Sequence, residues 1–382
     1  MIKRLIANLL QKRLTEYPAI ALIGPRQAGK TTLAKSLTEN YYDLEANSDR
    51  LRIDSQWDNL VENAGNLVAL DEAQSWPEIF PRLRSAIDKE RERKRRFLLL
   101  GSVSPMLMTH VSESLAGRLG LVYLSPLILC EFPDMAANLD KVWLAGGYPE
   151  GGALAQSRFP QWHRDYLSLL IQRDLRNWGL PAKPAMTERL VAMLAALHGQ
   201  LWNASNVSQA LGISHPTVNT YLDYLEGAFL IRRLMPFHVN IRKRLVKSPK
   251  IYWRDSGLLH SILNVPEFNL LFKQPWVGAS WEGFVIEQII STLESLGKHC
   301  RPFFFRTHDR HEIDLVLDFG SQVWAIEIKL TSSPSEDDLR RLTASAKLIG
   351  ASRSILISRM REVTTSASVT ISNLPDFLVS LL

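Results

Sequence analysis

The chain has 382 residues, 46% of them hydrophobic and 22% charged, which excludes a disordered or fibrous protein and allows two or three domains with their own cores. The two cysteines, Cys130 and Cys300, exclude a disulfide framework, and no apolar run reaches the roughly 18 residues of a membrane span, so we expect a cytoplasmic protein in a reducing compartment, without a membrane partner. The formal net charge of +6 is compatible with a polyanionic partner, but a solvated basic face gives the same value.

The first organised segment is AIALIGPRQAGKTT, in which a short apolar strand meets a glycine loop and then a helix-forming run. Gly24 and the triplet Gly29-Lys30-Thr31 have the spacing of a phosphate loop. In such a loop, backbone N–H groups and a helix N-terminus face the phosphates, the lysine reaches the β and γ oxygens, and the threonine hydroxyl ligates Mg²⁺. We therefore predict a site for ATP and Mg²⁺ whose nucleotide-binding residues are Gly24, Pro25, Arg26, Gln27, Ala28, Gly29, Lys30, Thr31 and Thr32.

Two further apolar strands end in polar residues that fit the same site. Residues 67–72, LVALDE, end in Asp71, which we expect to hold Mg²⁺, and in Glu72, which we expect to activate the attacking water. Residues 97–102, FLLLGS, end in Ser102, which we expect near the γ-phosphate. The alternative for LVALDE is a strand with an ordinary polar end. Strands that alternate with helical segments predict an α/β fold, with a parallel sheet covered on both faces and the ligand at its carboxyl edge.

Arg118, in the segment LAGR, is a candidate for catalysis between subunits. It lies in a loop with Gly117, just before the apolar strand LGLVYL. An arginine offered to the γ-phosphate of a neighbouring subunit stabilises the charge of the transition state, and this role predicts a homo-oligomer. The alternative is an ordinary surface arginine.

A boundary follows at the glycine cluster GGYPEGG, residues 146–152. Residues 162–178 then predict a helix that carries Arg164, Arg173 and Arg176. This helix is either a lid over the nucleotide or a connection between domains.

Residues 186–235 predict a helix-turn-helix unit. A helix over 186–201 precedes a short helix at 205–211, a turn at Gly212, a longer helix from Ser214 and a wing-like strand, FLIRRL. The apolar positions leave Thr217, Asn219 and Thr220 for a DNA groove, or alternatively for solvent or a neighbouring subunit. The run RKRLVKSPK, residues 242–250, has five basic residues that we expect to follow DNA phosphates. Its DNA-binding candidates are Arg242, Lys243 and Arg244.

Residues 311–330, HEIDLVLDFGSQVWAIEIKL, predict a β-hairpin that carries acids among its apolar residues. A two-residue turn at Gly320-Ser321, with positive φ at the glycine, places Asp314 opposite Glu327 and Glu312 opposite Lys329. Two facing carboxylates repel each other and destabilise the hairpin unless a cation lies between them.

The acids of this hairpin indicate a second chemical site. Asp314 and Glu327 as metal ligands, with Lys329 to orient a water or stabilise a phosphate, are typical of a Mg²⁺-dependent phosphodiesterase. The alternative is the polar face of an edge hairpin. The preceding helix, residues 280–296, adds Glu282 and Glu287 as candidate carboxylates.

The ordered set GPRQAGKT, LVALDEAQ, LLLGS, LAGR, GGYPE, PKIYWRDSGLL and HEIDLVLD…AIEIK resembles a prokaryotic family of AAA-type P-loop ATPases, over nearly the whole chain. The C-terminal domain of that family is uncharacterised and contains a winged-helix segment and a PD-(D/E)XK nuclease-like fold. The resemblance implies ATP binding through Gly29, Lys30, Thr31 and Asp71, hydrolysis assisted by Glu72, and nuclease-like residues Asp314, Glu327 and Lys329. The usual Pro-Asp dipeptide is absent, because Ile313 precedes Asp314.

These segments predict an order of domains and a function. We expect an AAA-type ATPase core (1–150), a helical lid or linker (151–185), a winged helix-turn-helix-like unit (186–240), a basic connector (241–275) and a restriction-endonuclease-like α/β domain (276–382). The hypothesis is an ATP-hydrolysing protein that acts on DNA, a motor or remodeller of branched or broken DNA with a Mg²⁺-dependent nuclease-like end domain. The alternatives are an ATP-dependent switch or defence regulator, and an ATPase whose end domain clamps DNA without cutting it.

Overall fold

A sheet of parallel strands forms the N-terminal part of the protein, as the alternating pattern predicted. The structure is a computed structural model that describes residues 2–62, 67–102, 115–180, 183–238, 246–309, 311–366 and 369–382. The sheet has the strand order β2-β3-β4-β1-β5 and only parallel pairings. Its strands are β1 (Ala19–Ile23), β2 (Tyr41–Asp43), β3 (Val68–Asp71), β4 (Phe97–Gly101) and β5 (Leu119–Tyr123). Strands β1 and β4 are buried along their whole length, which explains their continuous apolar sequences.

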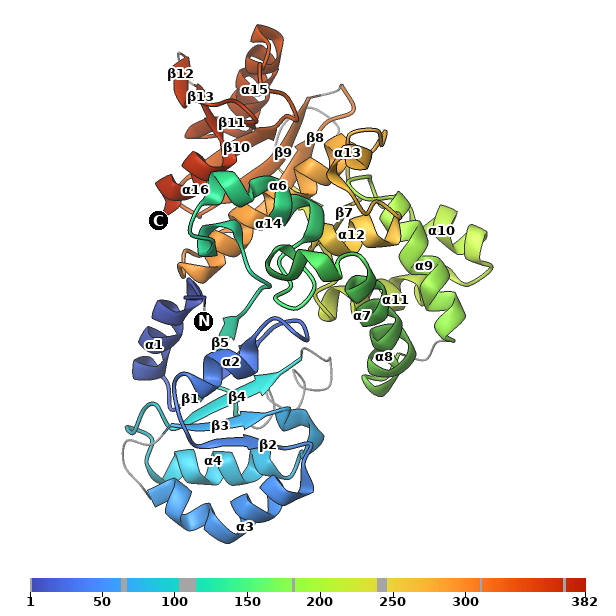
Figure 1. The fold of residues 1–382 in the computed structure, drawn as a ribbon. Helices are drawn as coiled ribbons and strands as arrows, with labels where there is room; N and C mark the ends of the chain where they lie inside the picture. Colours follow the sequence, from blue (N-terminus) through green and yellow to red (C-terminus); the bar gives the residue numbers. More distant parts are fainter. Residues whose placement is uncertain are drawn as a thin grey trace.

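Helices cover both faces of this sheet (Figure 1). Helix α1 (Ile6–Glu16) buries Ile6, Leu10 and Leu14 in the core that it shares with α2 (Lys30–Lys35). Helices α3 (Asn47–Glu62) and α4 (Ile79–Lys89) and the short helix η1 (Ala73–Ser75) pack on the opposite face. The loops that follow β1, β3 and β4 therefore meet at the open carboxyl edge of the sheet.

The chain leaves this first unit earlier than the sequence predicted. After β5 come η2 (Leu129–Glu131) and α6 (Met135–Ala145), and both pack in the hydrophobic core of the C-terminal part. Trp143 of α6 is fully buried against Trp281, with ring centroids 5.0 Å apart. Leu124 is the last residue here that packs in the core of the first unit, so this unit ends near Leu124, whereas we expected it to extend to residue 150.

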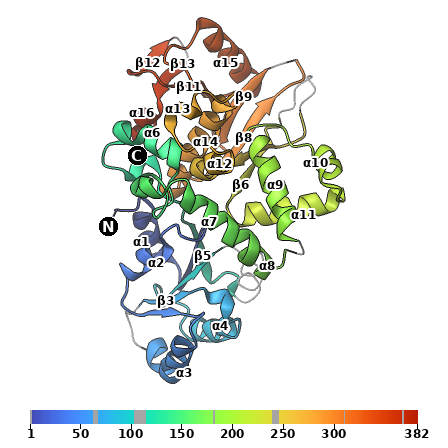
Figure 2. The ribbon, with the colours of Figure 1, turned by 45° about the vertical axis from the view of Figure 1, so that its right-hand side comes forward.

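A helical region with its own core follows in the chain. Its elements are η3 (Ala153–Arg158), α7 (Gln161–Leu169), the π-helical turn η4 (Leu170–Asp174), α8 (Leu175–Asn177), α9 (Pro184–Ala196), α10 (Ala204–Leu211) and α11 (His215–Gly227). The side chains of Asn203 and Ser214 cap α10 and α11, and Gly212 between them has a positive φ of 66°. The two helices of the predicted helix-turn-helix are therefore present, at the outer side of the molecule (Figure 2).

The C-terminal part is built on a mixed sheet of eight strands in the order β12-β13-β11-β10-β9-β8-β6-β7. Helices α14 (Val277–Ser295) and α16 (Leu374–Leu381) cover one face and α15 (Glu336–Ile349) the other. The strands are β6 (Ile231–Pro236), β7 (Lys250–Trp253), β8 (Arg301–Arg306), β9 (Glu312–Asp318), β10 (Val323–Ile328), β11 (Arg353–Ser358), β12 (Thr364–Ser366) and β13 (Val369–Asn373).

The segment predicted as a wing and a basic connector is part of this C-terminal structure. Strand β6 pairs antiparallel with β7, and its last residues, Met235 and Pro236, pair with β8. After β7, helix α12 (Ser256–Ile262) is buried and α13 (Phe268–Leu271) packs beside α6. The strand is therefore joined to the large sheet, and β7 and α12 are buried structural elements rather than part of a connector.

The β9–β10 hairpin has the predicted register. Asp318 pairs with Val323 and Leu315 with Ile326, and the Phe319 N–H donates to the Gln322 carbonyl (3.0 Å) across a turn in which Gly320 has a φ of 81°. In the part of the chain that the structure describes, no helix is both long and apolar enough to cross a membrane.

Candidate nucleotide site and carboxylate cluster

The phosphate loop lies at the carboxyl edge of the first sheet. It passes so close to the end of β5 that a Cβ on Gly24 would lie 2.0 Å from the Leu124 carbonyl oxygen, which requires glycine there. Gln27 and Gly29 have positive φ values of 64° and 97°, and α2 begins directly after them. The predicted loop between strand and helix is thus formed.

Lys30 is buried inside this loop. Its ammonium donates to the carbonyl oxygens of Gly24 and Pro25, both at 2.8 Å. Burial lowers the pKa of Lys30 to about 8, and the charges of Glu72 and Asp71 oppose this shift. The ammonium is held by neutral backbone groups, which an anionic ligand can replace.

Asp71 and Thr31 lie in direct contact. The Thr31 hydroxyl donates to Asp71 Oδ2 at 2.6 Å, and the Tyr41 hydroxyl, which the sequence did not single out, donates to the same oxygen at 2.6 Å. A hydroxyl and a carboxylate, together with nucleotide phosphates and water, are the oxygen ligands that Mg²⁺ prefers. These residues therefore fit a nucleotide-bound Mg²⁺, with Thr31 and Asp71 as its protein ligands and charge neutralisation on the phosphates as its contribution.

Glu72 and Ser102 meet at the ends of β3 and β4. The Ser102 hydroxyl donates to Glu72 Oε1 at 3.4 Å, and the side-chain amide of Gln74 donates to the other carboxylate oxygen. Burial raises the pKa of Glu72, while Arg26 and Lys30 oppose the shift. A partly desolvated carboxylate of this kind can accept a proton from, or orient, an attacking water.

A cavity of about 620 Å³ brings these groups together. Lys30, Thr31, Asp71, Glu72 and Ser102 all line it. Arg4, which the sequence did not single out, also lines it and donates to the Ala28 carbonyl (2.8 Å) and to Glu131 (3.0 Å). The cavity is large enough for a nucleotide-sized ligand.

Arg26 of the loop contacts the helix predicted as a lid or a connection. Its Nη1 donates to Asp174 Oδ1 at 2.9 Å, and the Arg173 Nε donates to the same oxygen at 2.9 Å. Asp174 is buried in the π-helical turn η4. The helix is thus joined to the phosphate loop by an ion pair.

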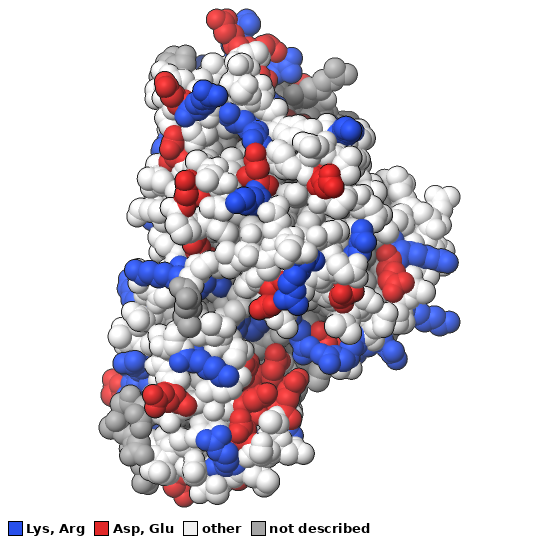
Figure 3. Space-filling view, in the orientation of Figure 1, with Lys and Arg blue, Asp and Glu red and all other residues white. Residues whose placement is uncertain are grey.

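Basic side chains gather on the face beside α7 and α8, directly above a group of acidic ones (Figure 3). Arg173, Arg176 and Lys183 line an open groove of about 790 Å³ in this region. In the helix-turn-helix, Thr217, Asn219 and Thr220 are partly exposed on α11, and their side-chain hydrogen bonds to described residues stay within their own segment, to Ser214, His215 and Pro216. Arg242, Lys243 and Arg244 lie outside the described residues.

Arg118 lies at the opposite edge of the sheet from the phosphate loop. It precedes β5, whose residue Leu119 pairs with Ala19 at the start of β1, whereas the loop follows the end of β1. Its guanidinium donates to both carboxylate oxygens of Asp88, at 2.8 and 3.0 Å. A role at the phosphates of its own chain is excluded by this position, so the predicted role between subunits stays a proposal.

A second cluster of acids lies on the hairpin of the C-terminal sheet. Asp314 is buried, and its Oδ2 accepts the Ile328 N–H at 2.9 Å. Burial, and then the neighbouring Glu327, raises the pKa of Asp314 well above its ordinary value. Lys329 forms an ion pair with Glu327 at 2.7 Å. The structure thus brings the three predicted residues together on one face.

Lys250 is an unexpected member of this cluster. The sequence predicted that its basic run follows DNA phosphates, but the Lys250 ammonium is buried and lies 3.1 Å from Glu282, 2.9 Å from Glu312 and 3.9 Å from Asp314. Tyr252 also donates to Glu282. Burial lowers the pKa of Lys250, but Glu282 and the other neighbouring charges outweigh it, so that the pKa lies well above its ordinary value. For Lys250, the prediction of a phosphate contact was wrong, because strand pairing turns its side chain inward.

The cluster does not fit the Mg²⁺ that we predicted from the sequence. Among the described residues, no group of three or more acidic, histidine or cysteine side chains is arranged to hold a metal ion. The Lys250 ammonium stands where such an ion would neutralise Glu282, Glu312 and Asp314.

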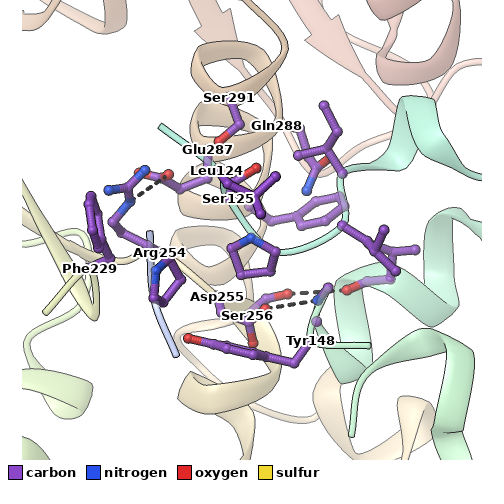
Figure 4. A pocket seen from close by; sticks show the side chains of 18 of the residues that line it. Leu124, Ser125, Tyr148, Phe229, Arg254, Asp255, Ser256, Glu287, Gln288 and Ser291 are labelled. Atoms are coloured by element: carbon purple, nitrogen blue, oxygen red, sulfur yellow. Dashed lines mark hydrogen bonds and ion pairs between the residues drawn. The ribbon is translucent and has the colours of Figure 1, made fainter. Parts of the chain in front are cut away.

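Glu287, the other predicted carboxylate of α14, belongs to a different place. It pairs with Arg232 and with Arg254, whose Nε lies 3.1 Å from Glu287 Oε2. Figure 4 shows Arg254 and Glu287 on one side of a small cavity of about 40 Å³, and Asp255 below it. Pro25 of the phosphate loop also lines this cavity. Glu287 therefore lies where the ATPase unit contacts the C-terminal core.

Residues 16–133 match the AAA domain family. Together with the strand order and the phosphate loop, this match identifies a P-loop ATPase of the AAA type, which binds and hydrolyses ATP. Residues 136–269 and 277–377 match two domains of unknown function, DUF8612 and DUF4143. The chain belongs to the same family as two uncharacterised proteins, from Mycobacterium bovis and Mycobacterium tuberculosis. Each is 39% identical over 339 residues, which is 87% of this chain and 75% of the relative.

Solved structures give weaker likenesses. A variant of RuvB from Thermotoga maritima matches 59% of this chain and 87% of its own at 16% identity and a TM-score of 0.29. The replication initiator DnaA, bound to AMPPCP and single-stranded DNA, matches 58% of this chain and 86% of its own at 14% identity and a TM-score of 0.24.

Proposed function

We propose that this AAA-type ATPase acts on DNA, as a motor or remodeller that uses ATP hydrolysis to move a duplex, branched or broken DNA held by its C-terminal half. One observation carries the catalytic half of the proposal: buried Lys30, the Thr31–Asp71 contact and Glu72 converge on a cavity of nucleotide size. This geometry supports roles for Lys30 on the phosphates, Asp71 at the metal ion and Glu72 at the water.

Two features support DNA as the partner. Thr217 and Asn219 lie in the first turns of α11, and the N-terminal part of the second helix contacts base edges in helix-turn-helix proteins. The groove with Arg173, Arg176 and Lys183 belongs to the same helical region and offers charges to phosphates. The name of the DnaA structure, which includes single-stranded DNA, is compatible with this choice but adds no argument.

The proposal has two versions, which differ in the role of the end domain. In the first, which follows from the family resemblance, Asp314, Glu327 and Lys329 belong to a DNA-cutting site. In the second, the domain grips DNA and does not cut it. The contacts of Lys250 with Glu282, Glu312 and Asp314 favour the second version, because they already neutralise the acids that a metal ion would need.

A candidate of a different class is an ATP-dependent switch or defence regulator. The ion pair of Arg26 with Asp174 favours it, because it joins the phosphate loop to the helical region without any DNA contact. A switch of this kind turns over slowly and does not respond to nucleic acid.

Phosphate release from ATP and Mg²⁺ by the full chain tests the proposal, with and without duplex, single-stranded and four-way-junction DNA, while the strands are followed on a gel. We expect DNA to raise the rate, Lys30→Ala to abolish it, and Thr217→Ala with Asn219→Ala to remove the response to DNA. Ser205→Ala, an exposed change on α10, is the matched control. Turnover that is indifferent to every DNA overturns the proposal and supports the switch. Cleavage lost in Asp314→Ala identifies the cutting version.

A further inference from the structure

Lys250 is held in place by the backbone on both sides. It is the first residue of β7 and pairs with Leu234 of β6, while an isolated bridge joins it to Leu201. The last residues of β6 pair with β8, the neighbour of β9 in the sheet. This chain of pairings directs the Lys250 side chain toward the acids of β9.

The contacts of Lys250 are those of an ammonium that serves as a counter-ion. Three carboxylates surround it, Glu282 from α14 and Glu312 and Asp314 from β9, at 3.1, 2.9 and 3.9 Å. The Phe304 ring lies on another side, 5.6 Å from Nζ to the ring centroid. A side chain that is only 5% exposed and has these neighbours has little freedom to leave.

The remaining oxygens of the cluster do not form a chelating set. Asp314 Oδ2 accepts the Ile328 N–H, and Glu327 Oε1 accepts from Lys329. In the described part of the chain, Glu327 Oε2 is buried without a hydrogen-bond partner. A divalent cation placed beside the Lys250 ammonium is repelled by it, so these oxygens are not offered to Mg²⁺ while Lys250 is in place.

We propose that Lys250 is the resident cation of this carboxylate cluster, and that it masks a latent site for one divalent metal ion. The inference goes beyond the proposed action on DNA, because it concerns cation binding and holds whatever the end domain grips. It also separates Lys250 from Lys329, which contacts Glu327 alone among these acids and is 37% exposed.

Counting bound Mn²⁺ in the nucleotide-free full chain tests the proposal, with the electron paramagnetic resonance signal of free Mn²⁺ as the readout. We expect the unchanged protein to bind as many ions as Lys247→Met, a change at an exposed lysine of the same segment. Lys250→Met is expected to bind one more Mn²⁺ per chain and to lose it again when Asp314→Asn is added. Mn²⁺ is also expected to raise the melting temperature of Lys250→Met and not that of the unchanged protein.

Two outcomes overturn the proposal. One is a folded Lys250→Met protein that gains no Mn²⁺. The other is the loss of one Mn²⁺ when Asp314→Asn is made with Lys250 intact, which means that lysine and metal share the site. If circular dichroism shows that Lys250→Met does not fold, the second comparison decides alone. Equal Mn²⁺ counts for the unchanged protein and for Asp314→Asn then support Lys250 as the cation that masks the site. DNA-stimulated hydrolysis is measured separately, so failure of one idea leaves the other standing.

Discussion

The ATPase unit and the end domain each bury a lysine among acids, and they do so in opposite ways. Lys30 is 6% exposed and Lys250 is 4% exposed. Lys30 donates to two backbone carbonyls, and burial lowers its pKa to about 8. Lys250 lies against Glu282 and Glu312 at 3.1 and 2.9 Å, and the sum of its neighbours raises its pKa well above the ordinary value.

The difference shows that burial alone does not fix the role of a charged group. An ammonium held by neutral carbonyls is incompletely compensated and gains from an anionic ligand such as a phosphate. An ammonium held by carboxylates is already compensated and acts as an internal counter-ion. The arrangement around Lys30 therefore favours binding of an anion, and the arrangement around Lys250 disfavours binding of a further cation.

The largest expected effect on stability is that of Lys250→Met. The change leaves Glu282, Glu312 and Asp314 without their buried counter-ion, which costs about 3–5 kcal/mol when a buried pair is broken. Urea unfolding at pH 7 measures it. Lys329→Met is the matched control, and a smaller loss is expected because the Lys329 side chain is 37% exposed and pairs with Glu327 alone among the acids of the carboxylate cluster. Equal losses of unfolding free energy in Lys250→Met and Lys329→Met would contradict the role of Lys250 as the buried counter-ion.

Lys30→Ala is expected to abolish catalysis without loss of the fold. Removing one charged donor to a transition state costs about 10²–10³-fold in rate, and Lys30 lines the nucleotide cavity. Phosphate release under saturating ATP and Mg²⁺ measures it. Lys12→Ala, an exposed change on α1, is the control. Retained turnover in Lys30→Ala would show that Lys30 is only a structural lysine.

Glu72→Gln is expected to lower the rate and to flatten its pH profile. Burial raises the pKa of Glu72, and the carboxylate must be ionised to accept a proton from water. The rate of the unchanged enzyme therefore falls as the pH drops through this raised pKa. The rate of phosphate release is measured between pH 5 and 8 for both proteins. At the plateau, the variant is expected to be slower by at least about 10²-fold. An acid limb that persists in Glu72→Gln assigns the limb to another group.

The smallest expected effect is the pH dependence of stability that Lys30 confers. Its pKa of about 8 lies below that of the unfolded chain, so between pH 8 and 10 the unfolded state binds more protons and stability rises with pH. The slope is at most about 1.4 kcal/mol per pH unit. Unfolding of the unchanged protein and of Lys30→Met at pH 7.5 and 9.5 measures it. Identical pH dependence in both proteins contradicts the lowered pKa.

Local signals predicted much of the fold and most of the nucleotide site. The strand before Gly24 and the helix after Thr31 identified the loop, and the Gly320-Ser321 turn set the hairpin register. Lys250 could not be found in this way. In the sequence it closes a basic run, and only the pairing of β7 with β6 and of β6 with β8 brings it to the acids. A lysine at the start of an apolar strand was the available signal.

Long-range packing also explains the other differences. Helix α6 packs in the C-terminal core because Trp143 meets Trp281, a contact between residues far apart in the chain. Arg4 reaches the nucleotide site from the segment before α1, and Tyr41 reaches it from β2, and neither segment carries a sequence motif. Glu282 and Glu287 are indistinguishable as candidates in the sequence. Only the positions of Arg232 and Arg254, which pair with Glu287, show that the two glutamates belong to different places.

The comparison of the two lysines is tested most directly by competitive acetylation of the native protein with acetic anhydride at pH 8, read out residue by residue by mass spectrometry. A lysine reacts as the free amine, so Lys30, with its pKa of about 8 and its place in the nucleotide cavity, is expected to be labelled faster than Lys250. ATP with Mg²⁺ is expected to protect Lys30 and to leave Lys250 unchanged. Labelling of Lys250 as fast as that of Lys30, or a Lys30 that ATP does not protect, would contradict the opposite roles of the two lysines.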